Sequence, residues 1–438
     1  MPRVLVLSFA PLPAAGRLTP GSGTRPYEMA RALARAGLEV TLLARETGDP
    51  VPGVEVRAFE GESAPPLPGG FDAYVLPPGS FGSGFTRPAD GLVVADLYDP
   101  FLFSYALRDA ATPEGRIEFE SRIHAMASAL LAADVALHAG THARHALLGM
   151  LALIGRIAPG HADPGDDLLD VPFGAAAPPP APPIVTDPPL PPDAEVVLWP
   201  SGTYVYFDAE RALAAFERVA AKRPAAHLLV AGALGPSPSA ADRANYERFR
   251  AAAAASDAAA RIRFVGWLPY HARGAVYAAA RVAMVLTRPG PEDELSWRNR
   301  VIDAVGAGLP VVVDGESDLS RIVLDAGAGV RADRTVDGAA SALERVLGDA
   351  GARSHLAAGA LQLAKGALSW DACVAPLVAR IARGRRAEGG LAPSPVAAVR
   401  LARRRWGSAL HRAEVSLRLR GPAGFLAHGL RRARGGRT

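Results

Sequence analysis

Residues 292–315 read EDELSWRNRVIDAVGAGLPVVVDG. Three acidic residues in four positions open this stretch, two arginines follow, and two glycines precede a run of valines. Ser296 is a good N-cap residue, and acidic residues suit the positive end of a helix. Gly306 and Gly308 then allow a tight turn into the apolar residues 309–313. We therefore expect a helix that leads directly into a buried strand, as in a parallel α/β sheet.

The same alternation of short apolar strands and helical patterns occupies both halves of the chain. In the first half we expect a helix at 25–36 and strands at 4–9, 39–44, 54–59, 73–76, 92–95 and 135–138. In the second half we expect helices at 209–221 and 271–280, an alanine-rich helix that ends near residue 260, and strands at 196–199, 227–231, 263–265 and 282–286. This alternation indicates parallel sheets, whose ligands lie at the carboxyl ends of the strands.

A proline-rich segment separates the two halves. Ten of the 22 residues from 172 to 193 are proline, a density that excludes a helix or a central strand. We expect this segment to be a semi-rigid connector. At 438 residues the chain is also too long for one ordinary core. The sequence thus predicts an α/β protein with two Rossmann-like parallel-sheet domains facing across a cleft, plus a basic helical C-terminal tail. The predicted bounds are 1–175 for the first Rossmann-like domain, 176–193 for the linker, 194–385 for the second Rossmann-like domain and 386–438 for the tail.

Composition excludes several classes of protein. Apolar residues make up 49% and charged residues 21%, as expected of a folded globular chain. The single cysteine, Cys373, excludes an intramolecular disulfide and fits a reducing compartment, and no Cys/His cluster offers a zinc site. No apolar stretch approaches the roughly 20 residues that span a bilayer. We expect a cytoplasmic protein. A very short signal peptide is an alternative interpretation of the first residues, but a first parallel strand explains them as well.

The basic character of the chain is confined to its C-terminal end. The formal net charge is +4, yet residues 400–438 hold eleven arginines and one acidic residue, so this tail carries +10 and the rest of the chain −6. A negative body argues against nucleic acid as a partner. Arginines and apolar residues at helical spacing over 397–438 indicate a basic amphipathic helix on an anionic membrane surface, peripheral to the inner face of the plasma membrane. A disordered or partner-binding tail is the alternative.

Asp303 is the residue of the opening stretch that most needs a functional explanation. In one interpretation the acids and Ser296 only cap a helix, and the arginines are solvated. That interpretation leaves unexplained why aspartate, a poor helix former, stands in the middle of the helix. In the other, the stretch forms a nucleotide-sugar pocket, where the carboxylate accepts hydrogen bonds from ribose hydroxyls and Arg298 and Arg300 face the diphosphate. We favour the second interpretation.

The stretch resembles the donor-binding signature of retaining glycosyltransferases of the GT-B fold, glycosyltransferase family 4 (group 1). In that family an acid, a seven-residue gap and a second acid precede a small-Gly-x-Pro-Val-Val run. Residues 303–312 match the second half, with Asp303 for the usual Glu, whereas Leu295 occupies the place of the first acid. Glu294 and Glu292 lie one and three residues earlier. A bacterial subgroup with a pattern resembling E-T-R-F-S-F-R-T-R-x-x-D fits better, and the residues that fall on it are Glu292, Ser296, Arg298, Arg300 and Asp303.

The resemblance covers most of residues 1–385. Residues 23–40, GTRPYEMARALARAGLEV, are similar to the family's opening pattern G-x-R-x-x-E-L-A-x-x-L-x-x-x-G-H-x-V. Residues 96–100, DLYDP, resemble a subgroup motif at the end of a strand, and residues 369–371, SWD, look like the start of a helix that returns toward the first domain. The loop 200–204 departs from the family, because it lacks the Arg and Lys that neutralise the donor diphosphate in many members.

The resemblance implies transfer of a sugar from a nucleotide-diphosphate donor to a hydroxyl acceptor, with retention and without a metal or other cofactor. The acceptor would be a glycan or a lipid-linked glycan, in surface polysaccharide or glycolipid synthesis. Asp96 and Asp99 are the predicted catalytic residues, because carboxylates at a strand end can accept the proton of the acceptor hydroxyl or orient the sugar. Arg298 and Arg300 take over the role of the missing Arg/Lys pair, or donor binding is weak. The predicted donor-binding residues are Gly21, Gly23, Arg25, Gly202, Glu292, Glu294, Ser296, Arg298, Arg300 and Asp303.

Two other functions remain open at this point. A nucleotide-sugar epimerase on the same two-domain plan would convert the nucleotide sugar without an acceptor. A catalytically degenerate GT-B subunit would bind or scaffold a partner transferase, as the missing Arg/Lys pair and the displaced first acid suggest. The lone histidines at 124, 138, 142 and 145 are weaker candidates for a base, because such residues are usually packed or solvated.

Overall fold

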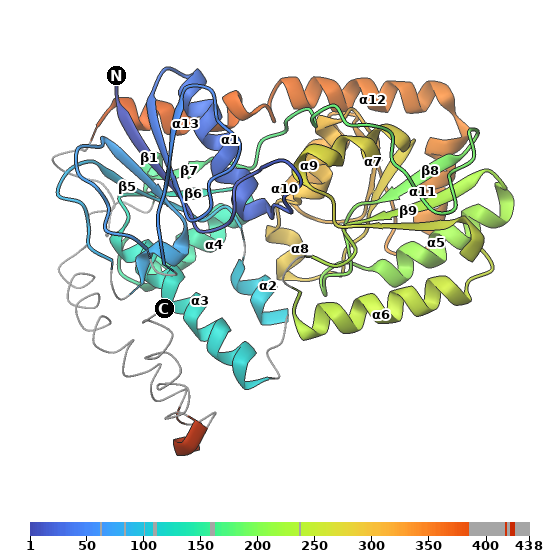
Figure 1. Cartoon of the computed structure of the whole chain (residues 1–438), viewed down its shortest axis with the longest axis horizontal. Coiled ribbons are helices and arrows are strands. Elements are labelled where there is room, and N and C mark those ends of the chain that lie inside the picture. The colour runs from blue at the N-terminus through green and yellow to red at the C-terminus, as the bar shows by residue number, and fades with distance from the viewer. Residues whose placement is uncertain are drawn as a thin grey trace.

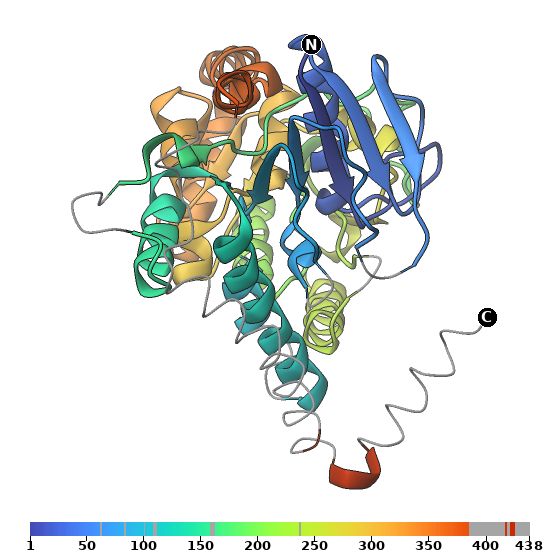
Figure 2. The same cartoon turned by 90° about the vertical axis from the view of Figure 1, so that its left-hand side faces the viewer.

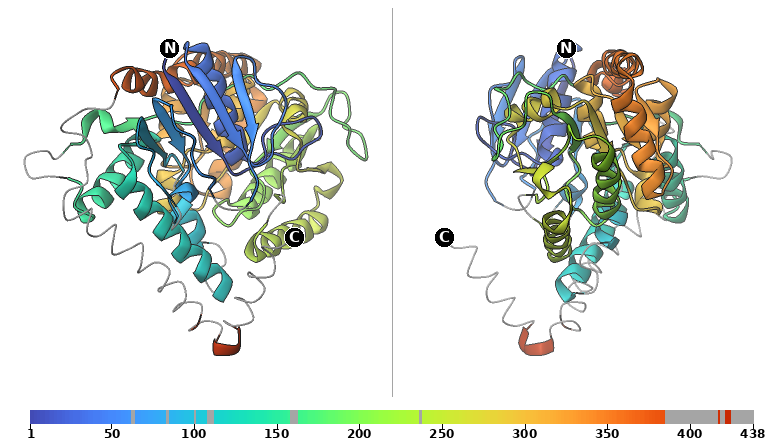
Figure 3. Two further views of the ribbon diagram at one scale, coloured as in Figure 1. Left: turned by 60° about the vertical axis from the view of Figure 1, so that its left-hand side comes forward. Right: turned by 90° about the vertical axis from the view of Figure 1, so that its right-hand side faces the viewer.

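The computed structural model describes residues 1–61, 64–82, 85–99, 101–107, 112–157, 163–235, 238–384, 417 and 421–424. Within them the chain forms two parallel β-sheets that lie beside each other, each flanked by helices (Figure 1). We use "first unit" for residues 1–170 together with 370–382, and "second unit" for residues 195–365. Figure 3 shows the molecule with the first unit toward the viewer on the left and with the second unit toward the viewer on the right.

The first sheet has the strand order β3-β2-β1-β4-β5-β6-β7, and every neighbouring pair is parallel. Its strands are β1 (Arg3–Ser8), β2 (Glu39–Ala44), β3 (Val54–Ala58), β4 (Ala73–Leu76), β5 (Leu92–Asp96), β6 (Val135–His138) and β7 (Leu168–Asp170). The order reverses direction between β1 and β4, where a doubly wound sheet opens a crevice for ligands.

The second sheet repeats the same winding in the order β10-β9-β8-β11-β12-β13, again with parallel pairs. Its strands are β8 (Glu195–Trp199), β9 (Ala226–Ala231), β10 (Ile262–Gly266), β11 (Val282–Val285), β12 (Val311–Val313) and β13 (Gly329–Arg331). Strands β9, β11 and β12 are buried along their whole length. Continuous apolar runs are expected where helices cover both faces of a parallel sheet.

Helices connect successive strands in both units. Those of the first unit are α1 (Gly21–Arg35), α2 (Phe101–Leu107), α3 (Pro113–Ala132), α4 (Gly140–Leu153) and the returning α13 (Trp370–Ala382), with 3-10 turns at Pro78–Phe81 and Gly165–Asp167. Those of the second unit are α5 (Ala209–Lys222), α6 (Ala240–Ala255), α7 (Arg273–Ala279), α8 (Pro291–Leu295), α9 (Asn299–Gly306), α10 (Asp318–Asp325), α11 (Val336–Gly348) and α12 (Ala350–Lys365), with 3-10 turns at Ala259–Arg261 and Tyr270–Ala272. Helix α3 projects beyond the rest of the first unit in Figure 2.

The chain passes between the two units twice, and the two crossings touch. The proline-rich connector leaves the first unit after β7, and the Ala175 amide donates to the Leu368 carbonyl at 2.6 Å. Helix α13 then packs against α1 and β7 of the first sheet, although the predicted bounds placed it in the second domain. Arg380 of α13 forms an ion pair with Asp167 at 3.0 Å, and both side chains are buried. The C-terminal helix of the described core is therefore part of the first unit.

The opening stretch folds as α8, α9 and β12, with two differences from the prediction. Ser296 does not cap the second helix, because its Oγ donates back to Glu292 and α9 begins at Asn299 without a side-chain cap. Gly308 has the expected left-handed backbone, with a φ of 69°. Gly306 serves another purpose, since a Cβ there would lie 2.2 Å from the Ala176 carbonyl oxygen of the connector.

Other expected elements differ at their ends. Helix α1 begins at Gly21, four residues before the predicted start, because Pro20 is extended and Pro26 fits inside the helix. Strand β7 was not predicted. The predicted amphipathic tail lies outside the described residues apart from residue 417 and residues 421–424. In the described part of the chain, no helix has the length and apolarity needed to cross a bilayer.

Candidate functional site

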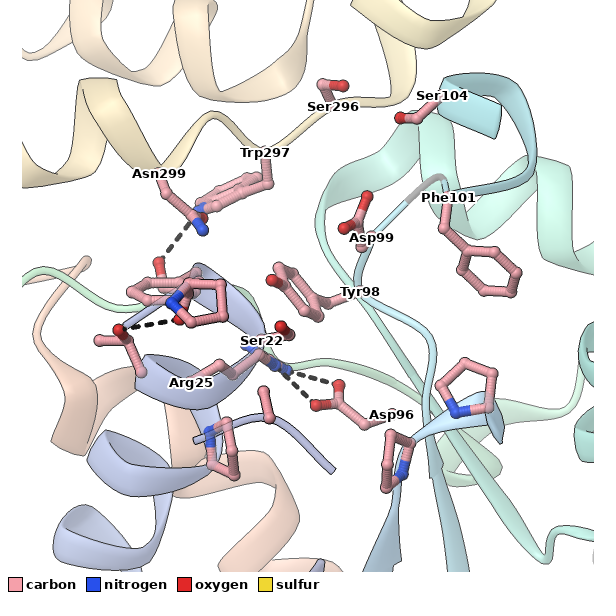
Figure 4. Close-up of a pocket in the computed structure, with 18 of the residues that line it drawn as sticks. Ser22, Arg25, Asp96, Tyr98, Asp99, Phe101, Ser104, Ser296, Trp297 and Asn299 are labelled. Atoms are coloured by element: carbon pink, nitrogen blue, oxygen red, sulfur yellow. Dashed lines mark hydrogen bonds and ion pairs between the residues drawn. The ribbon is translucent and has the colours of Figure 1, made fainter. Parts of the chain in front are cut away.

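A cavity of about 630 Å³ lies between the two units, at the carboxyl ends of both sheets. The first unit contributes the ends of β1, β4 and β5, the start of α1, and α2. The second unit contributes the loop after β8, Trp267, Arg273 and the stretch from Glu292 to Asp303. Figure 4 shows residues of both units pointing into this space. Both crevices predicted by the strand order therefore open into one shared cavity.

Most of the predicted site residues line this cavity. They are Gly21, Arg25, Asp96, Asp99, Glu292, Ser296, Arg298, Arg300 and Asp303. Gly23, Gly202 and Glu294 are not among the residues that line it.

Each of these three residues has a structural role elsewhere. A Cβ at Gly23 would lie 2.1 Å from the Pro11 carbonyl oxygen, so the glycine permits a close backbone approach. Gly202 has a φ of 69°, and a Cβ there would lie 2.5 Å from the Gly232 carbonyl oxygen. The Glu294 side chain is exposed, and its carbonyl oxygen lies 3.2 Å from the His142 ring.

Arg25 and Asp96 hold each other. The Arg25 guanidinium donates to both carboxylate oxygens of Asp96 at 2.7 and 2.8 Å and to the Val171 carbonyl at 2.7 Å (Figure 4). It also stacks on the Tyr98 ring, 4.0 Å from the ring centre. Arg25 is 1% exposed. These contacts make Asp96 a partner that fixes Arg25, and they leave it poorly placed to act as a base.

Asp99 is the carboxylate that faces the cavity without a partner. Among the described residues no hydrogen bond or ion pair holds it, and its side chain is open to the cavity. Asp99 is exposed within the cavity, yet the protein atoms that surround it reduce the hydration of its carboxylate. This desolvation, followed by the negative charge of Glu292, raises the pKa of Asp99 to about 6. Asp99 is thus a carboxyl that changes its charge close to neutral pH.

Glu292 is saturated with hydrogen bonds. Its two oxygens accept both Nη atoms of Arg298 at 2.9 and 2.6 Å, and Oε1 also accepts from Ser296 at 2.9 Å. Ser104 of α2, in the first unit, donates to the same oxygen at 3.2 Å. Arg298 in turn stacks between Tyr206 and Phe207, about 5 Å from each ring centre. Glu292 and Arg298 therefore neutralise each other and join the two units.

Arg300 differs from Arg298 because it makes no hydrogen bond within the described residues. Its Nη1 lies 3.5 Å from the Asp303 carboxylate, and its guanidinium stacks on Trp267 with 5.0 Å to the ring centre. Burial disfavours the charged form, but the Tyr277 hydroxyl and the Asp303 carboxylate outweigh burial and raise the pKa of Arg300. The side chain is a permanent cation in the cavity with N–H donors to spare.

Asp303 lies at the centre of a group of donors. The Tyr277 hydroxyl donates to its Oδ2 at 3.4 Å, Arg300 Nη1 is 3.5 Å away and Arg273 Nη1 is 4.0 Å away. Helix α9 places Asp303 one turn after Arg300, and the carboxylate remains partly open to the cavity. Oxygen lone pairs of Asp303 are therefore free to accept hydrogen bonds from a ligand.

Sequence reasoning missed several residues of the cavity. Arg273 opens α7 and donates to the Thr19 carbonyl at 2.6 Å. Tyr98 lies between the two predicted catalytic aspartates, and burial raises its pKa. Asn299 lies against Gly21 of the first unit. The sequence around Arg273 contains no motif that indicates a site residue, whereas Tyr98 and Asn299 lie inside the motifs described in the sequence analysis.

Other candidates lie elsewhere. None of the histidines at 124, 138, 142 and 145 lines the cavity. Arg211, the first arginine after the loop 200–204, pairs with Asp314 and donates to the Thr287 carbonyl at 3.0 Å. The Arg211 side chain is therefore held by contacts within the second unit, and it does not replace the missing Arg/Lys pair.

Comparison with known proteins agrees with this geometry. Residues 196–349 match the family model described as glycosyl transferases group 1. Sucrose-phosphate synthase from Thermosynechococcus elongatus has a similar structure, with a TM-score of 0.61 and 18% identity over 87% of this chain and 98% of that protein. The lipopolysaccharide glycosyltransferase WaaG aligns with a TM-score of 0.53 and 14% identity, over 86% of this chain and 98% of WaaG. Anabaena HepE, solved with UDP-glucose, aligns with a TM-score of 0.56 and 13% identity, over 87% of this chain and 98% of HepE. No curated protein sequence matches the chain.

Two facing α/β units that enclose one cavity define the GT-B class, and the structural neighbours share that fold. Within this class, residues 196–349 resemble a glycosyl transferases group 1 domain. The predicted family resemblance, the two-sheet fold class and the glycosyltransferase activity are confirmed. The family match and the shared fold together indicate a glycosyltransferase.

Proposed function

We propose that the cavity binds a nucleotide-diphosphate sugar with Arg300 at the diphosphate and Asp303 at the ribose. The observation that carries this proposal is the state of Arg300, a cation in the cavity whose N–H groups make no hydrogen bond in the described chain. Arg298 cannot take the same role, because Glu292 already neutralises it. Arg300 therefore supplies the charge that the loop 200–204 lacks.

The remaining contacts follow from the positions of the helices. The start of α1, with Gly21 and Ser22, and the start of α9 both face the cavity, and helix N-termini favour anions. Asp303 accepts hydrogen bonds from the ribose hydroxyls. Trp267, beneath Arg300, forms a wall beside the diphosphate.

Asp99 then serves the acceptor. For the configuration to be retained, the acceptor oxygen bonds to the anomeric carbon on the face that the diphosphate leaves, while the bond from that carbon to the diphosphate oxygen breaks and its electron pair leaves with the diphosphate. The hydroxyl proton passes to the Asp99 carboxylate. The group 1 resemblance supports retention at the anomeric carbon and a role in surface polysaccharide or glycolipid synthesis. It also supports a reaction without a metal cofactor.

Binding of UDP, GDP, ADP and their sugar conjugates, measured by titration calorimetry, tests the donor assignment. UDP and UDP-glucose come first, because HepE was solved with them. We expect Arg300→Gln to weaken binding of the preferred nucleotide by about 10- to 100-fold, the range for a hydrogen bond to a charged group. Arg331→Gln is the matched control, since its exposed pair with Glu316 is remote from the cavity.

Two outcomes would contradict the proposal. Equal loss of binding in Arg331→Gln and Arg300→Gln would show that the effect is not local to the cavity. No binding of any nucleotide by the wild-type protein would favour the degenerate-subunit hypothesis. In that case a partner transferase should be sought by co-purification.

A further inference from the structure

The first-unit half of the cavity has mostly apolar walls. Phe9 follows β1, Pro77 and Pro78 follow β4, and Phe101 and Tyr105 lie on α2. In Figure 4, Asp99, Phe101 and Ser104 lie on one side of the cavity, opposite Trp297 and Asn299 of the second unit. Aromatic rings and proline rings offer flat surfaces against which the apolar face of a ligand packs.

Nearly all charged side chains of this half form ion pairs. Two arginines line it, and both are paired: Arg25 with Asp96 at 2.7 Å and Arg122 with Glu118 at 2.5 Å. Arg122 also stacks on the Tyr105 ring, 4.6 Å from its centre. Asp99 is left without a cation. With Glu118 counted as the partner of Arg122, the charged side chains of this half among the described residues sum to −1.

We propose, on the basis of the proposed function, that the acceptor is an uncharged hydroxyl compound that presents its nucleophilic oxygen to Asp99 and packs an apolar face on Phe9, Phe101 and Tyr105. A glycoside and the first residue of a lipid-linked glycan share this chemistry. A sugar phosphate does not share it, because its phosphate would meet the Asp99 carboxylate without a free cation nearby.

The two halves of the cavity thus sort their ligands by charge. Arg300, whose N–H groups make no hydrogen bond in the described chain although Asp303 lies 3.5 Å away, lies in the second-unit half and attracts the anionic donor. The carboxylate without a partner lies in the first-unit half and repels anions. This separation disfavours binding of the nucleotide in the acceptor half, because like charges destabilise the wrong placement.

Binding of acceptor probes in the presence of saturating UDP tests this inference. UDP alone is titrated first, so that failure of the donor assignment is seen separately. The probes are the methyl, phenyl and octyl glycosides of glucose, galactose and mannose, together with the 6-phosphates of the same sugars. We expect at least one phenyl or octyl glycoside to bind about tenfold more tightly than its methyl glycoside, and none of the sugar phosphates to bind. A preference for octyl over phenyl would indicate a lipid-linked source, and the reverse a glycan.

Variants on one helix make the test specific. Phe101→Ala should remove the preference for the phenyl or octyl group. Phe103→Ala, on the same helix but not lining the cavity, should keep it. Asp99→Asn removes the repelling charge, so we expect it to allow a sugar phosphate to bind. Tighter binding of a sugar phosphate than of the methyl glycoside by the wild type would overturn the inference, as would binding of no glycoside at all by the UDP-loaded protein.

Discussion

At the scale of single residues, pairing decides which charged groups of the cavity are available. Asp96 and Asp99 stand three positions apart, and the sequence offers them as equivalent carboxylates. Arg25 lies 71 residues from Asp96 and binds Asp96 but not Asp99. This contact alone gives the two aspartates different roles. Glu292 and Arg298 looked like free donor ligands in the same way. A motif predicts which residues reach the cavity, but long-range partners determine which of them remain free.

Asp99 predicts the pH dependence of the reaction. Its pKa is raised to about 6, so the carboxylate form that accepts a proton predominates above pH 6 and is lost below it. We expect kcat/KM to rise with pH up to about 6 and then to level. Asp99→Asn should lower kcat/KM by at least about 100-fold, the lower range for general base catalysis, and should remove the rise. Nucleotide release, followed between pH 4.5 and 8, measures both.

Asp96→Asn is the comparison for this experiment. It should weaken the Arg25 contact and lower activity without removing the rise near pH 6. If Asp96→Asn removed the rise and Asp99→Asn kept it, the two roles would be reversed.

At the scale of helices and strands, most elements could be predicted from the sequence. Strands β2, β4 and β6 have the predicted bounds, because a short continuous apolar run between turn residues is typical of a buried strand. Strand β7 was missed since acidic residues surround it, and its pairing with β6 is a tertiary effect. The start of α1 was missed because two glycines and a proline disfavour a helix locally. Gly306 does not form the predicted turn but allows the connector to approach α9 closely, and this contact is visible only in the folded structure.

Gly306 and Gly149 form a contrasting pair of helical glycines. A Cβ at Gly306 would meet the Ala176 carbonyl, whereas nothing lies within 4 Å of a Cβ at Gly149 in α4. We expect Gly306→Ala to lower the free energy of unfolding by about 1–3 kcal/mol through overpacking. Gly149→Ala should raise it by about 0.5–1 kcal/mol through helix propensity. Urea unfolding measures both, and a stabilised Gly306→Ala protein would contradict the contact with the connector.

At the scale of the whole molecule, hydrogen bonds join the two units. Tyr270 donates to Glu28 at 2.6 Å, and the His271 ring lies 2.6 Å from Asp49. The bond from Ser104 to Glu292 is a further contact between the units. The sequence predicted two units and a cleft, but it could not predict these contacts, since each joins residues far apart in the chain.

The buried ion pair of α13 predicts how firmly this helix belongs to the first unit. Arg380→Ala removes the buried ion pair of the Asp167 carboxylate, and we expect it to lower the free energy of unfolding by about 3–5 kcal/mol. Arg383→Ala, which removes the neighbouring exposed pair with Asp166, should cost at most about 1 kcal/mol. Chemical unfolding of the two variants provides the comparison. Equal losses would show that α13 is not anchored through its buried pair.

The return of α13 has a consequence for dissecting the protein. A cut in the proline-rich connector does not yield two complete pieces, because an N-terminal fragment that ends there lacks the helix that covers α1 and β7. The fragment would expose the apolar surface that Trp370, Val374 and Leu377 now cover. A piece that begins after the connector would carry that helix with nothing to dock on. Two such fragments, produced together, should therefore associate, because α13 of the second fragment provides the surface that binds α1 and β7 of the first.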